Sequence, residues 1–302
     1  MNVVHVTSKI PQEGLDLLIR QGYQIRTGPL SKARGAHALL CMLTDTVDEK
    51  TMDNIGPQLK VISNMAVGLD NIQIDEAIKR GISFANTPGV LTEAVAEHAV
   101  ALLLAVARRI AEADVFVRAK KYKGWQADLL LGQELQGKSA GILGYGRIGS
   151  RVADILEKGF GMKVLYHDER RNEIADRNKA EYVSFEDLLR RSDVVSLHVP
   201  LLPGTRHLIG EKELGLMKKT AYLINTSRGA VVHEKALAQA LRNSVIAGAG
   251  IDVFEYEPKV DALLLKEKRI VLTPHIASAS KEARRAMAEL AAKNIIAVLE
   301  RV

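Results

Sequence analysis

The sequence predicts an α/β protein built from two doubly wound parallel sheets. Short apolar runs of the kind that form buried strands alternate with helical segments along almost the whole chain of 302 residues. This alternation is typical of parallel sheets with helices on both faces. The chain is about twice as long as a usual domain, and a glycine-rich motif of the nucleotide-binding type begins only at Gly144. Two domains are therefore expected, of which the second holds the nucleotide.

The first domain is predicted from short apolar runs separated by helical segments. We expect strands at residues 3–6, 38–43, 61–64 and 82–85 and helices at 12–21 and 74–80. A long helix then begins near residue 88, and Thr92 is its expected N-cap. Within this helix, His98 and its neighbour Glu97 are expected to form a buried hydrogen-bonded pair.

The second domain begins within the long helix and contains the remaining strands. We expect these strands at residues 140–143, 164–166, 194–197, 221–224, 246–251 and 270–272. An alanine-rich amphipathic helix at 281–299 follows them and is expected to return to the first domain. The predicted division assigns residues 1–98 and 280–302 to a substrate-binding domain and residues 99–279 to a nucleotide-binding Rossmann domain.

A dinucleotide site is predicted where the first strand of the second domain meets a helix. Gly144, Gly146 and Gly149 follow the apolar run 140–143. The first glycine permits a tight turn, the second lets the backbone approach a pyrophosphate, and the third lets the helix pack on the strand. Asp168 lies 19 residues (168 − 149) beyond the last glycine, where a carboxylate can accept both ribose hydroxyls of an adenosine. The glycines alone also fit a structural turn, but the strand, the helix and the spaced acid favour a nucleotide.

Three residues that can carry out proton and carboxylate chemistry directly follow predicted strands of the second domain. They are Arg228, Glu257 and His275, and they are expected to converge because ligands bind at the carboxyl edge of open parallel sheets. Arginine offers a planar fork for a carboxylate and its neighbouring carbonyl, histidine donates a proton near neutral pH, and glutamate can hold the imidazole. The set predicts keto-acid reduction. Each residue alone also fits a structural role, as a loop salt bridge, a turn residue before Pro258 and a capping or core histidine.

Composition and charge argue against several other classes of function. The chain has 42 basic and 36 acidic residues, but only 118–123 is a dense basic cluster, and no nucleic-acid-recognition pattern accompanies it. We therefore expect a small anionic substrate rather than nucleic acid, with the cluster at a solvated helix end. The single Cys41 indicates a reducing cytoplasm. The longest apolar run, 94–107, is too short to span a bilayer, and no clustered ligand spacing predicts a metal site.

At six places the sequence resembles the D-isomer-specific 2-hydroxyacid dehydrogenases, and the resemblance covers essentially the whole chain. The matching segments are residues 67–71, 86–98, 144–149, 225–229, 252–258 and 273–278. The resemblance implies a flavodoxin-like substrate domain closed by the C-terminal helix, and an inserted NAD-binding Rossmann domain that forms a homodimer. It also implies that Arg228 orients a 2-keto acid, that His275 donates the proton and that Glu257 pairs with His275.

The resemblance further implies which residues bind the two ligands. Backbone amides at Val67 and Gly68 bind the substrate carboxylate, together with the side chains of Arg228 and His275. The cofactor residues lie in the glycine motif, at the end of the next strand and in the loops after the later strands. They are Gly144, Gly146, Arg147, Ile148, Gly149, Asp168, His198, Val199, Pro200, Thr205, Thr226, Ser227, Asp252 and Ala277.

Within the family, segments 123–125 and 131–138 are most similar to glyoxylate and hydroxypyruvate reductases. Trp125 fits a subunit interface and a substrate contact equally well. Phosphoglycerate and phosphite dehydrogenases share the fold, but phosphite dehydrogenase has a lysine where this chain has Val67, and an apolar side chain cannot clamp a dianion. Nucleotide-sensing transcriptional corepressors also share the fold and are the alternative without enzyme activity.

Overall fold

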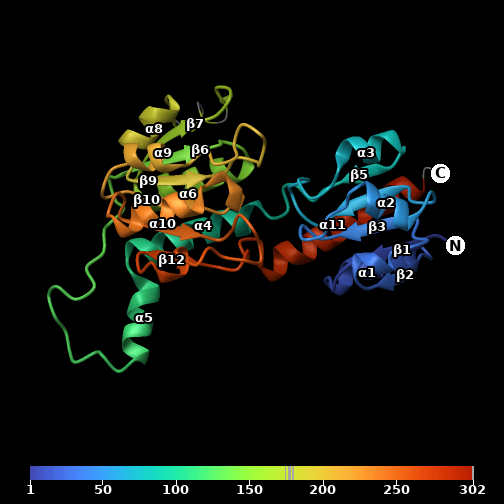
Figure 1. The fold of residues 1–302 in the computed structure, drawn as a ribbon, viewed down its shortest axis with the longest axis horizontal. Helices are drawn as coiled ribbons and strands as arrows, with labels where there is room; N and C mark the ends of the chain where they lie inside the picture. The colour runs from blue at the N-terminus through green and yellow to red at the C-terminus, as the bar shows by residue number, and fades with distance from the viewer. Residues whose placement is uncertain (174, 176–177, 179, 301–302) are drawn as a thin grey trace. The chain divides into compact units, whose positions relative to one another are not determined.

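A computed structural model of the chain describes residues 1–173, 175, 178 and 180–300 (Figure 1). The chain forms two compact units, Met1–Leu91 with Ser278–Val302, and Thr92–Ala277. The expected division at residue 98 falls inside helix α4 (Thr92–Ala107). That helix lies wholly in the second unit, because it packs against other helices and strands of that unit. The second division falls two residues before the one expected at 279.

The first unit is built on a five-stranded parallel sheet with the order β2-β1-β3-β4-β5. Its strands are β1 (Val3–Val6), β2 (Gln24–Thr27), β3 (Ala38–Cys41), β4 (Val61–Asn64) and β5 (Ser83–Ala85). This order is that of flavodoxin-like sheets, which confirms the predicted fold class. Strand β2 was not expected, because it is an edge strand with mostly exposed, polar side chains and therefore lacks an apolar run.

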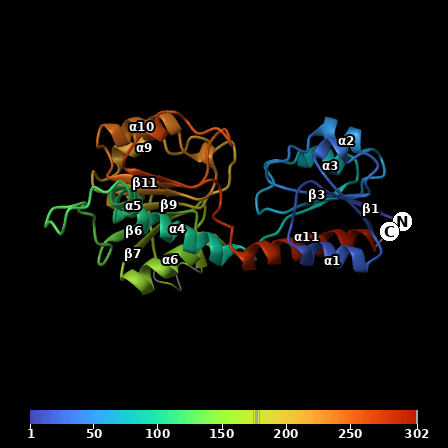
Figure 2. The ribbon, with the colours of Figure 1, turned by 90° about the horizontal axis from the view of Figure 1, so that it is seen from below.

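Helices cover both faces of the first sheet (Figure 2). On one face lie α1 (Gln12–Arg20) and α11 (Lys281–Leu299), and on the other lie α2 (Glu49–Ile55) and α3 (Ile74–Lys79). A short 3₁₀ helix, η1, spans Leu30–Lys32. Helix α11 has the predicted bounds and packs on α1, where Gly14 allows close approach because a Cβ there would lie 2.7 Å from the Ala288 carbonyl oxygen. The C-terminal helix is therefore part of the core of the first unit, as predicted.

The second unit is built on a seven-stranded parallel sheet with the order β12-β11-β10-β9-β6-β7-β8. Its strands are β6 (Ser139–Leu143), β7 (Lys163–His167), β8 (Glu181–Tyr182), β9 (Val194–Leu197), β10 (Tyr222–Asn225), β11 (Gly248–Ile251) and β12 (Ile270–Leu272). Reading from β8, the order contains the 3-2-1-4-5-6 arrangement of Rossmann folds. The predicted Rossmann class is confirmed, whereas the two-residue edge strand β8 was too short and polar to be predicted.

The helices of the second unit also lie on both faces of its sheet (Figure 2). Helices α4 and α6 (Arg147–Phe160) cover one face, and α8 (Phe185–Arg191), α9 (Glu211–Leu216) and α10 (Glu234–Arg242) cover the other. Two 3₁₀ helices, η2 (Gly229–Val231) and η3 (Leu264–Lys266), interrupt the loops. Helix α4 includes Thr92 as its first residue, so the expectation that Thr92 caps the helix from outside was wrong by one position. Among the described helices, none is both long and apolar enough to cross a bilayer.

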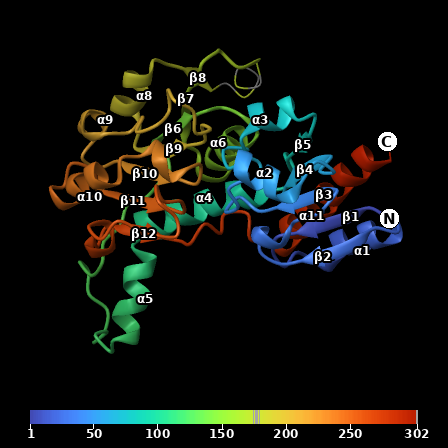
Figure 3. The same ribbon diagram turned by 45° about the vertical axis from the view of Figure 1, so that its right-hand side comes forward.

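Helix α5 (Ile110–Arg118) and the chain that follows it project from the rest of the second unit (Figures 1 and 3). The expected basic cluster lies where α5 ends, and Arg118 there pairs with Asp114 at 2.8 Å on the same exposed helix. Several apolar side chains of this arm face solvent, including Val115, Val117 and Trp125, which is 84% exposed. The arm therefore offers an unusual amount of uncovered apolar surface.

Candidate active site

The glycine motif forms the turn between β6 and α6, in which Gly144 and Gly149 leave room for close packing and Gly146 leaves open space. Gly144 has φ 88°, and a Cβ there would lie 2.8 Å from the carbonyl of His198. A Cβ on Gly149 would collide with the Gly144 carbonyl, so that glycine lets the helix pack on the turn. A Cβ on Gly146, the N-cap of α6, would meet nothing within 4 Å. The open space over Gly146 at a helix N-terminus fits a pyrophosphate.

Asp168 directly follows β7 and faces the glycine turn. Its Oδ2 accepts a hydrogen bond from the Tyr145 amide, and its Oδ1 accepts one from the Glu169 amide, both at 2.8 Å. Each carboxylate oxygen can accept a second hydrogen bond. A shallow hollow of about 350 Å³ lies over residues 168–173. The carboxylate is thus fixed at the edge of a solvent-open hollow, as a ribose-binding acid must be.

The segments after β9 and β10 contribute polar groups that fit the same cofactor. The Thr226 hydroxyl is buried, and among the described residues it has no hydrogen-bond partner, which fits a site for an absent ligand. Burial lowers the pKa of His198 to about 3, so this imidazole is neutral near pH 7. Its Nε2 lies 2.8 Å from the Ser196 hydroxyl. The Thr205 hydroxyl stabilises the loop after β9, because it donates to the Pro200 carbonyl at 2.6 Å.

Glu257 and His275, which are 18 residues apart in the sequence, are brought together by the ends of β11 and β12. Glu257 Oε2 lies 2.8 Å from His275 Nδ1, and the Phe254 amide donates to Glu257 Oε1 at 3.0 Å. Burial alone would raise the pKa of Glu257, but hydrogen bonds from His275 and Phe254 and the charges of His275 and Arg228 lower it below its ordinary value. Glu257 is therefore ionised near neutral pH and holds the imidazole by one nitrogen.

Arg228 lies in the turn after β10. The Asn225 side chain holds this turn, because its Nδ2 donates to the Arg228 carbonyl at 2.9 Å and its Oδ1 accepts from the Ser227 amide at 3.0 Å. The positive charge of Arg228 is near enough to contribute to the lowered pKa of Glu257. The three residues that were predicted to converge therefore lie at the same edge of the second sheet.

The family follows from comparison with known proteins. Residues 100–277 match the model of the D-isomer specific 2-hydroxyacid dehydrogenases, NAD binding domain. The chain belongs to this family. A glyoxylate reductase of Thermococcus litoralis is 52% identical over an alignment that covers 97% of this chain and 92% of that protein. The predicted family is confirmed, and this dehydrogenase contains the family's NAD-binding domain.

Solved structures give the same assignment for the fold. A crystal structure from Thermus thermophilus has a TM-score of 0.93 and 41% identity, covering 99% of this chain and 97% of the other. A D-lactate dehydrogenase from Aquifex aeolicus, complexed with NAD and lactic acid, has a TM-score of 0.88 and 31% identity, covering 99% and 96%. The dehydrogenase is thus an oxidoreductase that acts on CH–OH groups.

The structure corrects the expected partner of His98. Glu97 is exposed, whereas His98 Nε2 lies 3.1 Å from the Thr273 hydroxyl and 3.4 Å from Asp252 Oδ1. Adjacent helix residues do not face each other, so the expected pairing of His98 with Glu97 was wrong.

Asp252 is fully buried, and its described contacts are internal to the dehydrogenase. Oδ1 accepts from the Thr273 hydroxyl and the Ile276 amide, and Oδ2 accepts from the Ala277 amide. Its carbonyl accepts from the His275 amide at 2.8 Å. Asp252 and Ala277 therefore hold the turn that carries His275.

Sequence reasoning missed a network that ties the loops of the site together. Glu255 Oε1 accepts from Arg206 Nη2 at 2.7 Å and lies 2.8 Å from His207 Nε2. The Glu255 amide donates to the buried Glu234 carboxylate at 2.8 Å, and the His207 amide donates to the Ala230 carbonyl at 2.7 Å. The only signal for this network in the sequence is an acid two residues before Glu257. His207 thereby joins the loop after β9 to the loops that carry Arg228 and Glu257.

Gly229, directly after Arg228, allows the loops that carry Arg228 and Glu257 to touch. A Cβ at this position would collide with the Phe254 carbonyl group. We expect Gly229→Ala to lower Tm by several degrees, since overpacking costs about 1–3 kcal/mol, and to lower kcat/KM about 10-fold or more, because the displaced loop carries Glu257. The matched control is Gly215→Ala, where a Cβ meets nothing within 4 Å. Equal kinetics and equal melting curves for the two variants would contradict this prediction.

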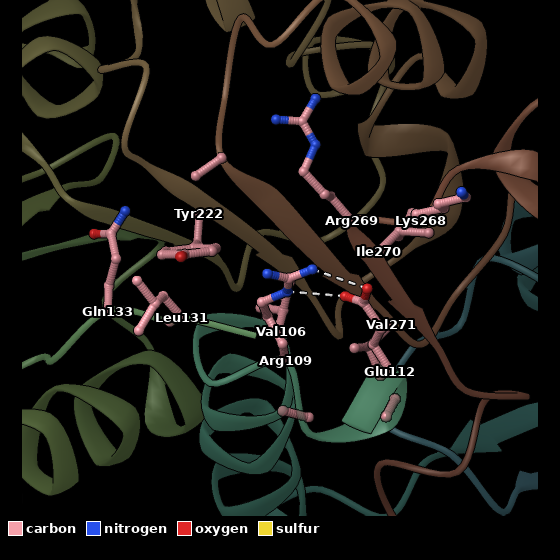
Figure 4. Close-up of a pocket in the computed structure, with 14 residues that line it drawn as sticks. Val106, Arg109, Glu112, Leu131, Gln133, Tyr222, Lys268, Arg269, Ile270 and Val271 are labelled. Carbon is pink, nitrogen blue, oxygen red and sulfur yellow. Dashed lines mark hydrogen bonds and ion pairs between the residues drawn. The ribbon is translucent and has the colours of Figure 1, made fainter. Parts of the chain in front are cut away.

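A cavity of about 280 Å³ lies apart from these residues, at the base of α5 (Figure 4). Figure 4 shows Tyr222 and Leu131 beside the cavity, and Arg109 paired with Glu112 through two hydrogen bonds. Tyr222 begins β10, so the cavity opens at the amino edge of the second sheet, opposite Arg228. None of the three catalytic candidates lines it. Among the described residues, no group of three or more His, Cys, Asp or Glu is placed to hold a metal ion.

Proposed function

We propose that this dehydrogenase reduces a small 2-keto acid of the glyoxylate or hydroxypyruvate type to the D-2-hydroxy acid with NADH. The observation that carries the proposal is the 2.8 Å pair of Glu257 and His275 at the sheet edge that also carries Arg228, within an NAD-binding unit. The name of the Thermococcus litoralis relative supports glyoxylate as the substrate.

In the proposed mechanism, NADH supplies the hydride, and the chain binds the keto acid and moves the proton. Glu257 binds Nδ1 of His275, which leaves Nε2 to donate a proton to the alkoxide oxygen as it forms. Arg228 binds the carboxylate and the neighbouring carbonyl oxygen with its planar fork and stabilises the developing charge. Backbone amides at Val67 and Gly68 bind the carboxylate.

The proposed cofactor site has three parts. The glycine turn of residues 144–149 receives the pyrophosphate, with amides of Arg147 and Ile148 at the helix start as donors. Asp168 accepts the adenosine ribose hydroxyls. The loops after the later strands surround the rest of the cofactor, and their residues are His198, Val199, Pro200, Thr205, Thr226, Ser227, Asp252 and Ala277. Of these, Asp252 and Ala277 act by holding the turn that carries His275 beside the cofactor.

NADH should be preferred to NADPH by about 10- to 150-fold in kcat/KM, because the Asp168 carboxylate would repel a 2′-phosphate and lose its hydroxyl hydrogen bonds. Arg170 and Arg171 line the same hollow, and their positive charges can attract a 2′-phosphate. NADPH should therefore be a poorer cofactor than NADH but should still be used. Asp168→Asn, which removes the charge and keeps the shape of the side chain, should lower the ratio of kcat/KM with NADH to kcat/KM with NADPH. Equal kcat/KM for the two cofactors in the wild-type protein would show that Asp168 does not select the cofactor.

We also propose that the protein is a cytoplasmic homodimer that associates through its NAD-binding unit. The exposed apolar side chains of α5 and the chain after it, among them Val115, Val117 and Trp125, support this. Trp125 serves either at the subunit interface or as a substrate contact. Light scattering after size exclusion should give twice the 33.1 kDa chain mass, and a mass of one chain would reject the dimer.

The test of the proposed function is NADH oxidation with a panel of 2-keto acids, compared by kcat/KM. Glyoxylate or hydroxypyruvate should give the largest value, with pyruvate, which carries a methyl group in place of the hydroxymethyl group of hydroxypyruvate, as the comparison. NADH binding without turnover of any keto acid would reject the proposal in favour of a nucleotide sensor. Turnover of phosphite or a phosphoglycerate instead would reject the substrate class but not the dehydrogenase.

A further inference from the structure

The loop after β4 has an unusual set of hydrogen bonds, in which three successive backbone carbonyls are each held by a specific donor. Two donors come from the segment after β5, and one comes from the end of β4. The Thr87 amide donates to the Ala66 carbonyl at 2.8 Å, Asn86 Nδ2 donates to the Val67 carbonyl at 2.7 Å, and Asn64 Nδ2 donates to the Gly68 carbonyl at 2.8 Å. Three consecutive peptide planes are therefore fixed.

Fixing these carbonyls also fixes the amides that follow them. In a trans peptide the C=O of one residue and the N–H of the next point in opposite directions, and among the described residues the only cis peptide is Glu257–Pro258. The amides of Val67, Gly68 and Leu69 must therefore point away from Thr87, Asn86 and Asn64. Across the described ranges, these three amides have no hydrogen-bond acceptor. Successive unpaired N–H groups of this kind form an anion-binding nest.

Both asparagines are themselves held in place by further hydrogen bonds, so their contacts to the loop are specific. Asn64 is fully buried, and its Nδ2 donates to Asn71 Oδ1 as well as to the loop, both at 2.8 Å. Asn71 in turn donates from Nδ2 to the Asp45 carbonyl at 2.9 Å. The backbone of Asn86 is held from α11, since Asn294 Nδ2 donates to its carbonyl at 2.9 Å. Because Asn64 has no exposed surface, it cannot contact the substrate itself and would act on it through the loop that its amide holds.

We propose that Asn64 and Asn86 are positioning residues for the substrate carboxylate, which they control by aiming the amides of Gly68 and Leu69. The inference deepens the proposed function and rests on it, since that function places the carboxylate at this loop. It adds the Leu69 amide to the expected amides of Val67 and Gly68. It also gives the first unit a specific task, which is to recognise the carboxylate of the keto acid rather than its side chain.

The test compares Asn86→Ala, Asn64→Ala and the control Asn54→Ala, in which an exposed asparagine is removed from α2 of the same unit. Asn86 is partly exposed, so Asn86→Ala should fold normally even if the buried Asn64→Ala does not. Loss of one oriented amide should raise KM for glyoxylate about 5- to 20-fold. kcat at saturation and KM for NADH should change by less than about 2-fold, and Asn54→Ala should match the wild type.

A second readout is the binding of oxalate, an unreactive dicarboxylate, to the enzyme–NADH complex, followed by NADH fluorescence. Its Kd should rise by the same factor as KM for glyoxylate. An unchanged oxalate Kd in Asn86→Ala would overturn the inference, as would parallel losses in NADH binding, kcat and Tm, which indicate a merely structural role. If the wild type reduces no keto acid, the proposed function fails, and the oxalate titration still decides whether Asn86 controls anion binding.

Discussion

Arg228→Ala should lower kcat/KM for the keto acid by about 10³-fold, because it removes a bidentate contact to the carboxylate and the charge that stabilises the reacting carbonyl. Arg228→Lys should recover little of this loss, since an ammonium group lacks the planar fork. The measurement is steady-state kinetics with glyoxylate at saturating NADH. The turn after β10 is held by the Asn225 side chain as well as by the Arg228 guanidinium, which donates to the Ser227 carbonyl at 2.8 Å. Because the Asn225 hydrogen bonds remain in both variants, both should fold.

Two controls separate the role of Arg228 from damage to the cofactor site. NADH affinity, measured by fluorescence, should change by less than about 3-fold in both variants if Arg228 acts on the substrate. The Glu257 carboxylate, whose pKa Arg228 helps to lower, should stay paired with His275. A lysine variant that keeps most of its kcat/KM would show that point charge alone is enough, and the assigned bidentate role would be wrong.

The parts of the fold that could be predicted are those with a strong local signal. Strands β4, β9 and β12 and helix α11 have the expected bounds, because buried apolar runs and a long amphipathic repeat are unambiguous. The edge strands β2 and β8 could not be predicted, since exposed edges carry polar side chains. The division at the start of α4 could not be placed either, because a continuous helix carries no sequence signal for the unit on which it packs.

The candidate site also contains contacts that could be predicted from the sequence and contacts that could not. The approach of Glu257 to His275 follows from one rule, that parallel strands end at one edge of a sheet. The partners of His98 do not follow from this rule. They depend on the packing of α4 against β11 and β12, which brings Asp252 and Thr273 beside the imidazole. The contacts of Glu255 with Arg206 and of Asn86 with Val67 are likewise made between segments that are far apart in the chain. No periodicity or spacing encodes such pairs, so only the structure reveals them.

The pH dependence should expose the pair formed by Glu257 and His275. The lowered pKa of Glu257 keeps its carboxylate ionised across the neutral range, and this charge is lost as the pH falls through that lowered value. An ionised Glu257 stabilises the protonated imidazole, which is the proton donor for keto-acid reduction. Reduction should therefore fall at high pH, and oxidation of the hydroxy acid, which needs the neutral imidazole as base, should fall at low pH.

Two variants test this pair in different ways. His275→Ala should lower turnover by about 10²- to 10⁴-fold, the usual range for a positioned general acid. Glu257→Gln keeps a hydrogen-bond acceptor beside Nδ1 but removes the charge, so the imidazolium becomes less stable and the alkaline limb of reduction should move to lower pH. The measurement is kcat/KM for the keto acid against pH, with NADH binding as the control. An alkaline limb that stays in place or moves upward would leave Glu257 with only a structural role in the loop.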